Sequence, residues 1–120
     1  PCEALLEALG NIGVSSPDVL NVITPFTHHP RPLVRAAACR ALLQLMKEQR
    51  WAVELEKLLQ HPEPLVRRGV LLDLGATGWT AALPAIESAS VEASLKLVAL
   101  RGLAEQSDDI KVLDVMDRLL

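Results

Sequence analysis

A seven-residue pattern occurs twice in this chain. The letters HPRPLVR, from His29 to Arg35, recur as HPEPLVR, from His61 to Arg67, with six of seven positions identical at a spacing of 32 residues. Each proline removes a backbone donor and disfavours helix in the residue before it, yet proline suits a helix's first turn. The pattern therefore predicts that one helix ends here and another begins, near Pro32 and again near Pro64.

Apolar residues take helical spacing after each copy of the pattern. The first stripe is Leu33, Ala37, Ala41, Leu42 and Leu45, and its counterpart is Val66, Val70, Leu71 and Leu74. Second helices are expected at 51–59 and, after a turn at 75–78, at 79–87. A degenerate copy begins at Ser94, and a last helix is expected at 109–120. Upstream, we expect a helix at 3–9 ended by Gly10, then one capped by Ser16 that Pro25 ends or kinks.

Helical hairpins at this period are typical of HEAT-like solenoids, whose units bury their apolar faces against neighbours. The landmarks of tetratricopeptide and ankyrin repeats are absent from the sequence. We therefore expect an all-α solenoid forming a single domain. Its repeats would be about 1–28, 29–60, 61–90 and 91–120, and the chain would be part of a longer protein.

Composition excludes several classes of function. Half of the residues are hydrophobic and only 2% are aromatic, which favours packed helices over a sandwich. The net charge of -3 offers no phosphate-neutralising surface, so nucleic acid is not an expected partner. No apolar run reaches the length of a membrane span. The two cysteines, Cys2 and Cys39, are expected to be reduced or buried.

Neither a conventional catalytic site nor a metal site is expected. His29 and His61 hold equivalent positions before proline, which favours a structural role at a helix end. His28 and His29 lack nearby cysteine or carboxylate ligands for a metal. The sequence has no nucleophile elbow and no glycine-rich phosphate loop.

A few charged and aromatic residues remain as candidates for binding. Arg67 repeats Arg35, so a staple of the solenoid is expected there. Arg68 is different, because its counterpart is Ala36 and the repeat does not demand a charge. Asp73, five residues later, lies about 140° around the helix. The two could serve as an anion holder and a carboxylate near a groove, and solvated surface charge is the alternative. Trp51 and Trp79 each open a second helix, as core filling or as an anchor for a partner.

Two stretches go beyond a generic repeat: LVRRGVLLDLGATG at 65–78 and SLKLVALRGL at 94–103. Together with the ends of the chain, EALLEALG and VLDVMDRLL, they closely resemble the C-terminal half of the E subunit of the E/F-type phycobilin lyases of cyanobacteria. The resemblance covers nearly the whole chain.

The resemblance implies a heterodimer with an F-type subunit in the cyanobacterial cytoplasm, near phycobilisomes. That heterodimer attaches a linear tetrapyrrole such as phycocyanobilin to a cysteine of a phycobiliprotein α subunit, as in phycocyanin. The bilin is then a substrate and no permanently bound cofactor is implied. Arg67, Arg68 and Lys96 would suit the propionates, Asp73 the pyrrole N–H groups, and Trp79 a bilin or partner. No catalytic residue can be assigned.

Other functions stay open at this point. Because family E subunits carry a further N-terminal half of repeats, the chain alone is not expected to be active, although the complete heterodimer is a lyase. The alternative is a non-enzymatic HEAT-repeat scaffold, for example in phycobilisome assembly or degradation. A repeat domain of unrelated role is the third possibility.

Overall fold

The computed structural model describes residues 2–120, and the regular structure of these residues is entirely helical. The chain divides into two compact units: unit 1 reaches as far as Leu55, and unit 2 runs from Glu56 to Leu120. The boundary falls within helix α4 (Gln49–Leu58). Each unit is described by itself.

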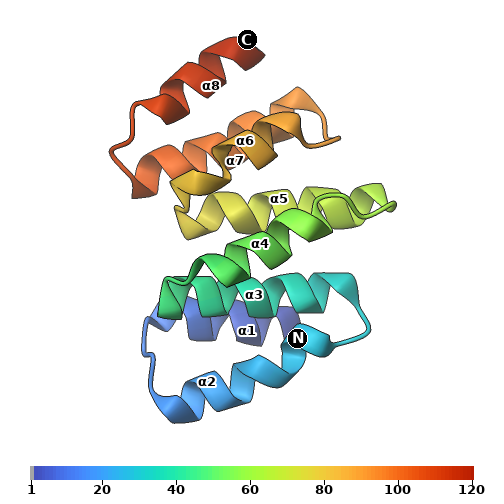
Figure 1. Ribbon diagram of the computed structural model, residues 1–120, viewed down its shortest axis with the longest axis vertical. Helices are drawn as coiled ribbons and strands as arrows, with labels where there is room; N and C mark the ends of the chain where they lie inside the picture. The colour runs from blue at the N-terminus through green and yellow to red at the C-terminus, as the bar shows by residue number, and fades with distance from the viewer. Residues whose placement is uncertain (1) are drawn as a thin grey trace. The chain divides into compact units, whose positions relative to one another are not determined.

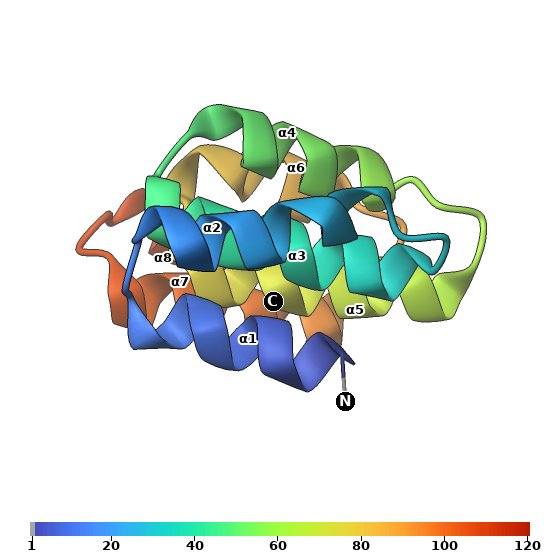
Figure 2. The ribbon, with the colours of Figure 1, turned by 90° about the horizontal axis from the view of Figure 1, so that it is seen from below.

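Unit 1 is built on two helices that lie side by side, α1 (Cys2–Ile12) and α3 (Pro32–Met46) (Figure 1, Figure 2). Helix α2 (Pro17–Ile23) and the 3-10 turn Thr24–His28 pack on α3. The core of the unit combines apolar residues from these segments: Leu6, Ile23, Val34, Ala37, Ala38, Ala41 and Leu42. The expected stripe on α3 is confirmed at Ala37, Ala41 and Leu42, and Leu33 and Leu45 at its margins are partly buried.

Unit 2 repeats this arrangement. Its side-by-side pair is α5 (Pro64–Thr77) and α7 (Ala93–Gln106), and α8 (Lys111–Leu119) packs on α7 (Figure 1). The 3-10 turn Thr80–Ala82 leads into α6 (Leu83–Ser88), which contacts both α7 and α8. All four residues of the predicted α5 stripe are buried: Val66, Val70, Leu71 and Leu74.

The predicted helix starts are confirmed where proline or a polar cap marks them. Helices α3 and α5 begin at Pro32 and Pro64. The Ser16 side chain accepts a hydrogen bond from the Val19 N–H at 3.3 Å and so caps α2. Pro25 ends α2 as expected, because the chain continues after Ile23 as a 3-10 turn.

Two helix ends predicted at glycine were wrong. Helix α1 continues through Gly10 to Ile12, and α5 continues through Gly75 to Thr77 instead of turning at 75–78. A Cβ on Gly10 would lie 2.9 Å from Ala41 Cα, and one on Gly75 would lie 2.8 Å from Ala99 Cα. Each glycine therefore lets two helices cross closely, and the predicted turn is replaced by Gly78 alone, which ends α5 with φ +70°.

Two other boundaries also differ from the prediction. The segment expected as a helix at 79–87 is a 3-10 turn followed by the short α6, with Pro84 in the helix's first turn. The last helix begins at Lys111 and not at 109, since the Asp109 carboxylate accepts the Lys111 backbone N–H at 3.0 Å and forms a turn. As expected, Cys2 and Cys39 are not joined in a disulfide, and Cys39 is buried.

Candidate functional site

Three positively charged residues occupy the same position in three helices, α3, α5 and α7. Arg35, Arg67 and Lys96 each donate a backbone hydrogen bond to the residue four positions earlier, which caps the N-terminus of α3, α5 or α7. Lys96 is therefore the counterpart of the two arginines, although its segment does not match their motif. This agrees with the degenerate copy of the repeat expected from Ser94 onward.

The side chains of these cations bind backbone carbonyls, most of them in the segment just before the helix that carries the cation. Arg35 Nη1 donates to the His29 and Pro30 carbonyls at 3.0 and 3.1 Å. Arg67 Nη1 does the same to His61 and Pro62, at 2.8 and 2.9 Å, and its Nε reaches the Ser90 carbonyl at 3.0 Å. The repeated arginine thus binds backbone carbonyls, as a staple would, and for Arg67 these include Ser90 at the end of its own expected repeat.

The two repeated histidines belong to the same loops. Nδ1 of His29 accepts the Arg31 backbone N–H, and Nδ1 of His61 accepts the Glu63 backbone N–H, each at 3.1 Å. Their expected structural role at a helix end is therefore confirmed. Among residues 2–120 no group of three or more metal-binding side chains occurs.

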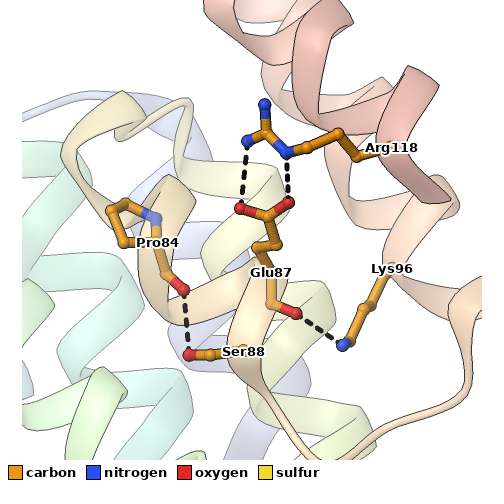
Figure 3. Close-up of polar contacts among 5 residues, drawn as sticks. All are labelled: Pro84, Glu87, Ser88, Lys96 and Arg118. Atoms are coloured by element: carbon orange, nitrogen blue, oxygen red, sulfur yellow. Dashed lines mark hydrogen bonds and ion pairs between the residues drawn. The ribbon is translucent and has the colours of Figure 1, made fainter.

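Lys96 takes part in a network that joins α6, α7 and α8 (Figure 3). Its Nζ donates to the Glu87 carbonyl at 2.6 Å, while the Glu87 carboxylate binds Arg118 through Nε at 2.6 Å and Nη2 at 3.0 Å. The hydrogen bonds from Arg118 lower the pKa of Glu87. Sequence reasoning missed Glu87 and Arg118, because nothing in their spacing shows that α6 and α8 meet.

Arg68 faces differently from its neighbour Arg67. Its guanidinium binds the Glu92 carboxylate at two points, Nε to Oε1 at 2.9 Å and Nη2 to Oε2 at 3.1 Å. Both side chains are about half exposed, at 45% and 46%. These hydrogen bonds lower the pKa of Glu92 and raise that of Arg68. Arg68 is thus an accessible cation whose one carboxylate partner comes from the start of α7.

Exposed apolar side chains flank Arg68. On α5, Leu65 lies three residues before Arg68 and Leu72 four residues after it, and their exposed fractions are 70% and 41%. Residues three and four apart share a helix face. On α7, Val98 is 56% exposed. We call Leu65, Arg68 and Leu72 of α5, taken with the exposed Val98 of the helix packed beside it, the α5–α7 face.

Asp73 and Trp79 do not belong to this face by their positions on the chain. Asp73 is partly buried and lies about 140° around α5 from Arg68, as its spacing implies. Trp79 follows α5, is partly buried and precedes the 3-10 turn. Trp51 packs against the core of unit 1 with Arg50 4.4 Å above its ring, so the core-filling interpretation is confirmed for Trp51.

The predicted site residues therefore divide into separate places. Arg67 lies in a groove of about 500 Å³ at the loop end of unit 2, which Glu56, His61 and Ser90 also line. A second groove of about 490 Å³ lies between α6 and α8, next to Glu87 and Arg118. Arg68 lines neither groove. Glu92, its partner, is the residue of this site that sequence reasoning missed.

Comparison with known proteins gives the family. Residues 27–104, most of the chain, match the family described as HEAT repeats. The chain belongs to the HEAT-repeat family. The predicted all-α HEAT-like class is thus confirmed by both the fold and the match. No helix of this HEAT-repeat chain within residues 2–120 has the length and apolar character to cross a membrane.

Individual proteins similar to this chain show which members of the family it resembles. The bilin biosynthesis protein RpcE of Synechococcus sp. WH8020 is 68% identical, and the match covers the whole HEAT-repeat chain and 45% of RpcE. The phycocyanobilin lyase subunit alpha of Nostoc sp. PCC 7120 is 43% identical, with 47% of that protein covered.

A solved structure, the complex of CpcE and CpcF of phycocyanin lyase from Nostoc sp. PCC7120, matches with a TM-score of 0.90 at 44% identity. The match covers 100% of this HEAT-repeat chain and 46% of the matched chain. The expected resemblance to phycobilin lyase subunits is confirmed, and the chain spans about half the length of the relatives it matches.

Proposed function

We propose that this chain is the C-terminal half of a lyase subunit that, with an F-type partner, attaches a bilin to a protein. The substrate would be phycocyanobilin or a related linear tetrapyrrole, and the acceptor a cysteine of a phycobiliprotein α subunit in the cyanobacterial cytoplasm. The similarity to phycocyanobilin lyase alpha subunits over the full chain, with a matching fold, supports this assignment. The chain would not act alone, since its relatives are about twice as long.

The α5–α7 face has the chemistry that a bilin needs. An open-chain tetrapyrrole carries apolar rings and two propionate groups. Leu65, Leu72 and Val98 offer apolar contact, and a guanidinium such as that of Arg68 binds a carboxylate through paired hydrogen bonds. Arg68 is the observation that carries this placement, because the repeat does not require a charge there and its side chain is half exposed.

The remaining predicted site residues would have other roles. Arg67 and Lys96 bind backbone carbonyls, so we assign them to holding α5 and α7 in place beneath the face. A direct contact of Arg67 or Lys96 with a bilin or a partner stays a prediction. Asp73 stays a prediction for the pyrrole N–H groups, and Trp79 for a bilin or a protein partner.

Transfer of bilin in vitro tests this function. The full-length protein would be mixed with its F-type partner, phycocyanobilin and the phycocyanin α subunit lacking chromophore, and a covalent red-absorbing product would be measured. We expect a product with the wild-type protein, and slower transfer after Arg68→Ala or Asp73→Ala with unchanged helix content. Unchanged transfer in both variants would rule out the residue assignment.

The same assay separates the alternative function. A non-enzymatic scaffold of phycobilisome assembly or degradation would bind the phycobiliprotein through its helical surface without forming the product. A result with binding but no covalent product would therefore favour the scaffold.

A further inference from the structure

Among α3, α5 and α7, only α5 carries a charged residue at the position of Arg68. Counting from each N-cap, its counterparts are Ala36 in α3 and Leu97 in α7. The Arg68–Glu92 pair is therefore not an element that the repeat reproduces from one hairpin to the next. It is a local feature of α5 and the start of α7.

Glu92 binds Arg68 through a carboxylate, the same chemical group by which an acidic ligand would bind it. Both of its oxygens are used, at 2.9 and 3.1 Å, on the Nε and Nη2 atoms of the guanidinium. That two-point contact is the geometry in which arginine binds carboxylates generally. Arg68 makes no other hydrogen bond with residues 2–120.

The pair is open to exchange because it is not buried. Its two side chains are 45% and 46% exposed, so water and solutes reach the charges, and exposed ion pairs contribute little to stability. An incoming carboxylate can take the place of Glu92 without burying an unpaired charge, since the freed Glu92 returns to water. The apolar Leu65 and Leu72 on either side along α5 would contact the remainder of such a ligand.

We propose that Glu92 is a built-in competitor that occupies Arg68 until a bilin propionate displaces it, so that Glu92 sets the affinity and selectivity of the site. This proposal rests on the proposed function. It makes Glu92 a specificity-determining residue: a bilin with a free propionate gains the Arg68 contact only by replacing Glu92. Ligands without a carboxylate leave the pair intact.

The test is the affinity of phycocyanobilin for the full-length subunit with its F-type partner, measured by absorbance titration. Glu92→Gln removes the competing charge and keeps the size of the side chain, so phycocyanobilin is expected to bind about two- to fivefold more tightly. The dimethyl ester of phycocyanobilin, which has no carboxylate, is expected to bind equally to both proteins.

The matched control is Glu87→Gln. Glu87 also binds an arginine at two points, and neither residue of that pair belongs to the α5–α7 face. The contact of Glu87 with Lys96 uses the main-chain carbonyl, which the substitution keeps. The substitution should not change the affinity for phycocyanobilin. Equal tightening by both variants would overturn the proposal, because the effect would then be one of net charge.

The remaining outcomes separate the proposal from the function on which it rests. Weaker or unchanged binding in Glu92→Gln would overturn the competitor role, because Glu92 would then orient Arg68 or play no part. Bilin transfer by the wild-type protein would leave the proposed function standing in that case. Absence of bilin binding by every protein, wild type included, would overturn both.

Discussion

At the residue scale, the neighbouring arginines Arg67 and Arg68 on α5 bind different groups. Arg67 binds three backbone carbonyls, of His61, Pro62 and Ser90, whereas Arg68 binds one exposed carboxylate. The repeated motif predicts the first role, since Arg35 recurs there. It marks Arg68 as an exception but cannot show Glu92, which lies 24 residues away on another helix. Long-range pairing of this kind depends on the packing of α5 against α7.

Arg67→Ala should lower the stability of the protein, because it leaves carbonyls at the helix end without their donor. Hydrogen bonds to a charged group suggest a loss of about 1.5–3 kcal/mol. Arg101→Ala is the control, since the Arg101–Glu105 pair is highly exposed and should be worth less than about 0.5 kcal/mol. Urea unfolding of the full-length protein measures both, and equal stability of Arg67→Ala and wild type would contradict the staple.

Acid should weaken the two glutamate–arginine pairs. Arg118 and Arg68 lower the pKa values of Glu87 and Glu92 from the ordinary 4.5, so the pairs stabilise the folded state above that pH. This contribution is lost as the pH falls through the lowered values, when the carboxylates take up protons. The thermal midpoint of wild type should therefore fall more steeply below pH 4.5 than that of the double variant Glu87→Gln and Glu92→Gln. Parallel pH profiles would contradict this.

At the scale of the elements, the sequence predicts helix boundaries well where proline or a polar cap marks them. Pro32, Pro64 and Ser16 act locally, through φ restriction and side-chain capping, so they were found correctly. Local rules predict that Gly10 and Gly75 end helices, yet both lie within helices. Their reason is a crossing with another helix, and no local rule reveals it.

Gly75→Ala tests whether the glycine is needed for the close crossing of α5 and α7. In an isolated helix, alanine would be favoured over glycine by about 1 kcal/mol. Here the new Cβ would lie 2.6 Å from the Ala99 carbonyl oxygen, so α5 and α7 would have to separate. We expect a net loss of about 1–3 kcal/mol, as in other overpacked contacts. A gain in stability on urea unfolding of the full-length protein would contradict the close crossing.

At the scale of the whole molecule, periodicity gave the class of fold, and the narrower motifs at 65–78 and 94–103 gave the kinship with phycobilin lyase subunits. Both are confirmed by the family match over residues 27–104 and by the similar structure. The site was less accessible to sequence reasoning. Of the five residues predicted, the fold directs Arg67 and Lys96 to backbone carbonyls and leaves Arg68 on an exposed face with apolar neighbours.

The central claim is that the α5–α7 face holds a bilin through Arg68. Its most direct test is a titration of phycocyanobilin into the full-length subunit with its F-type partner, comparing Arg68→Ala with the matched variant Arg118→Ala. Each variant loses one arginine and one two-point ion pair. We expect Arg68→Ala to weaken binding about two- to fivefold, because the exposed contact with the propionate takes the place of the one with Glu92, and Arg118→Ala to bind as wild type does. Equal affinity of Arg68→Ala and wild type would contradict the claim.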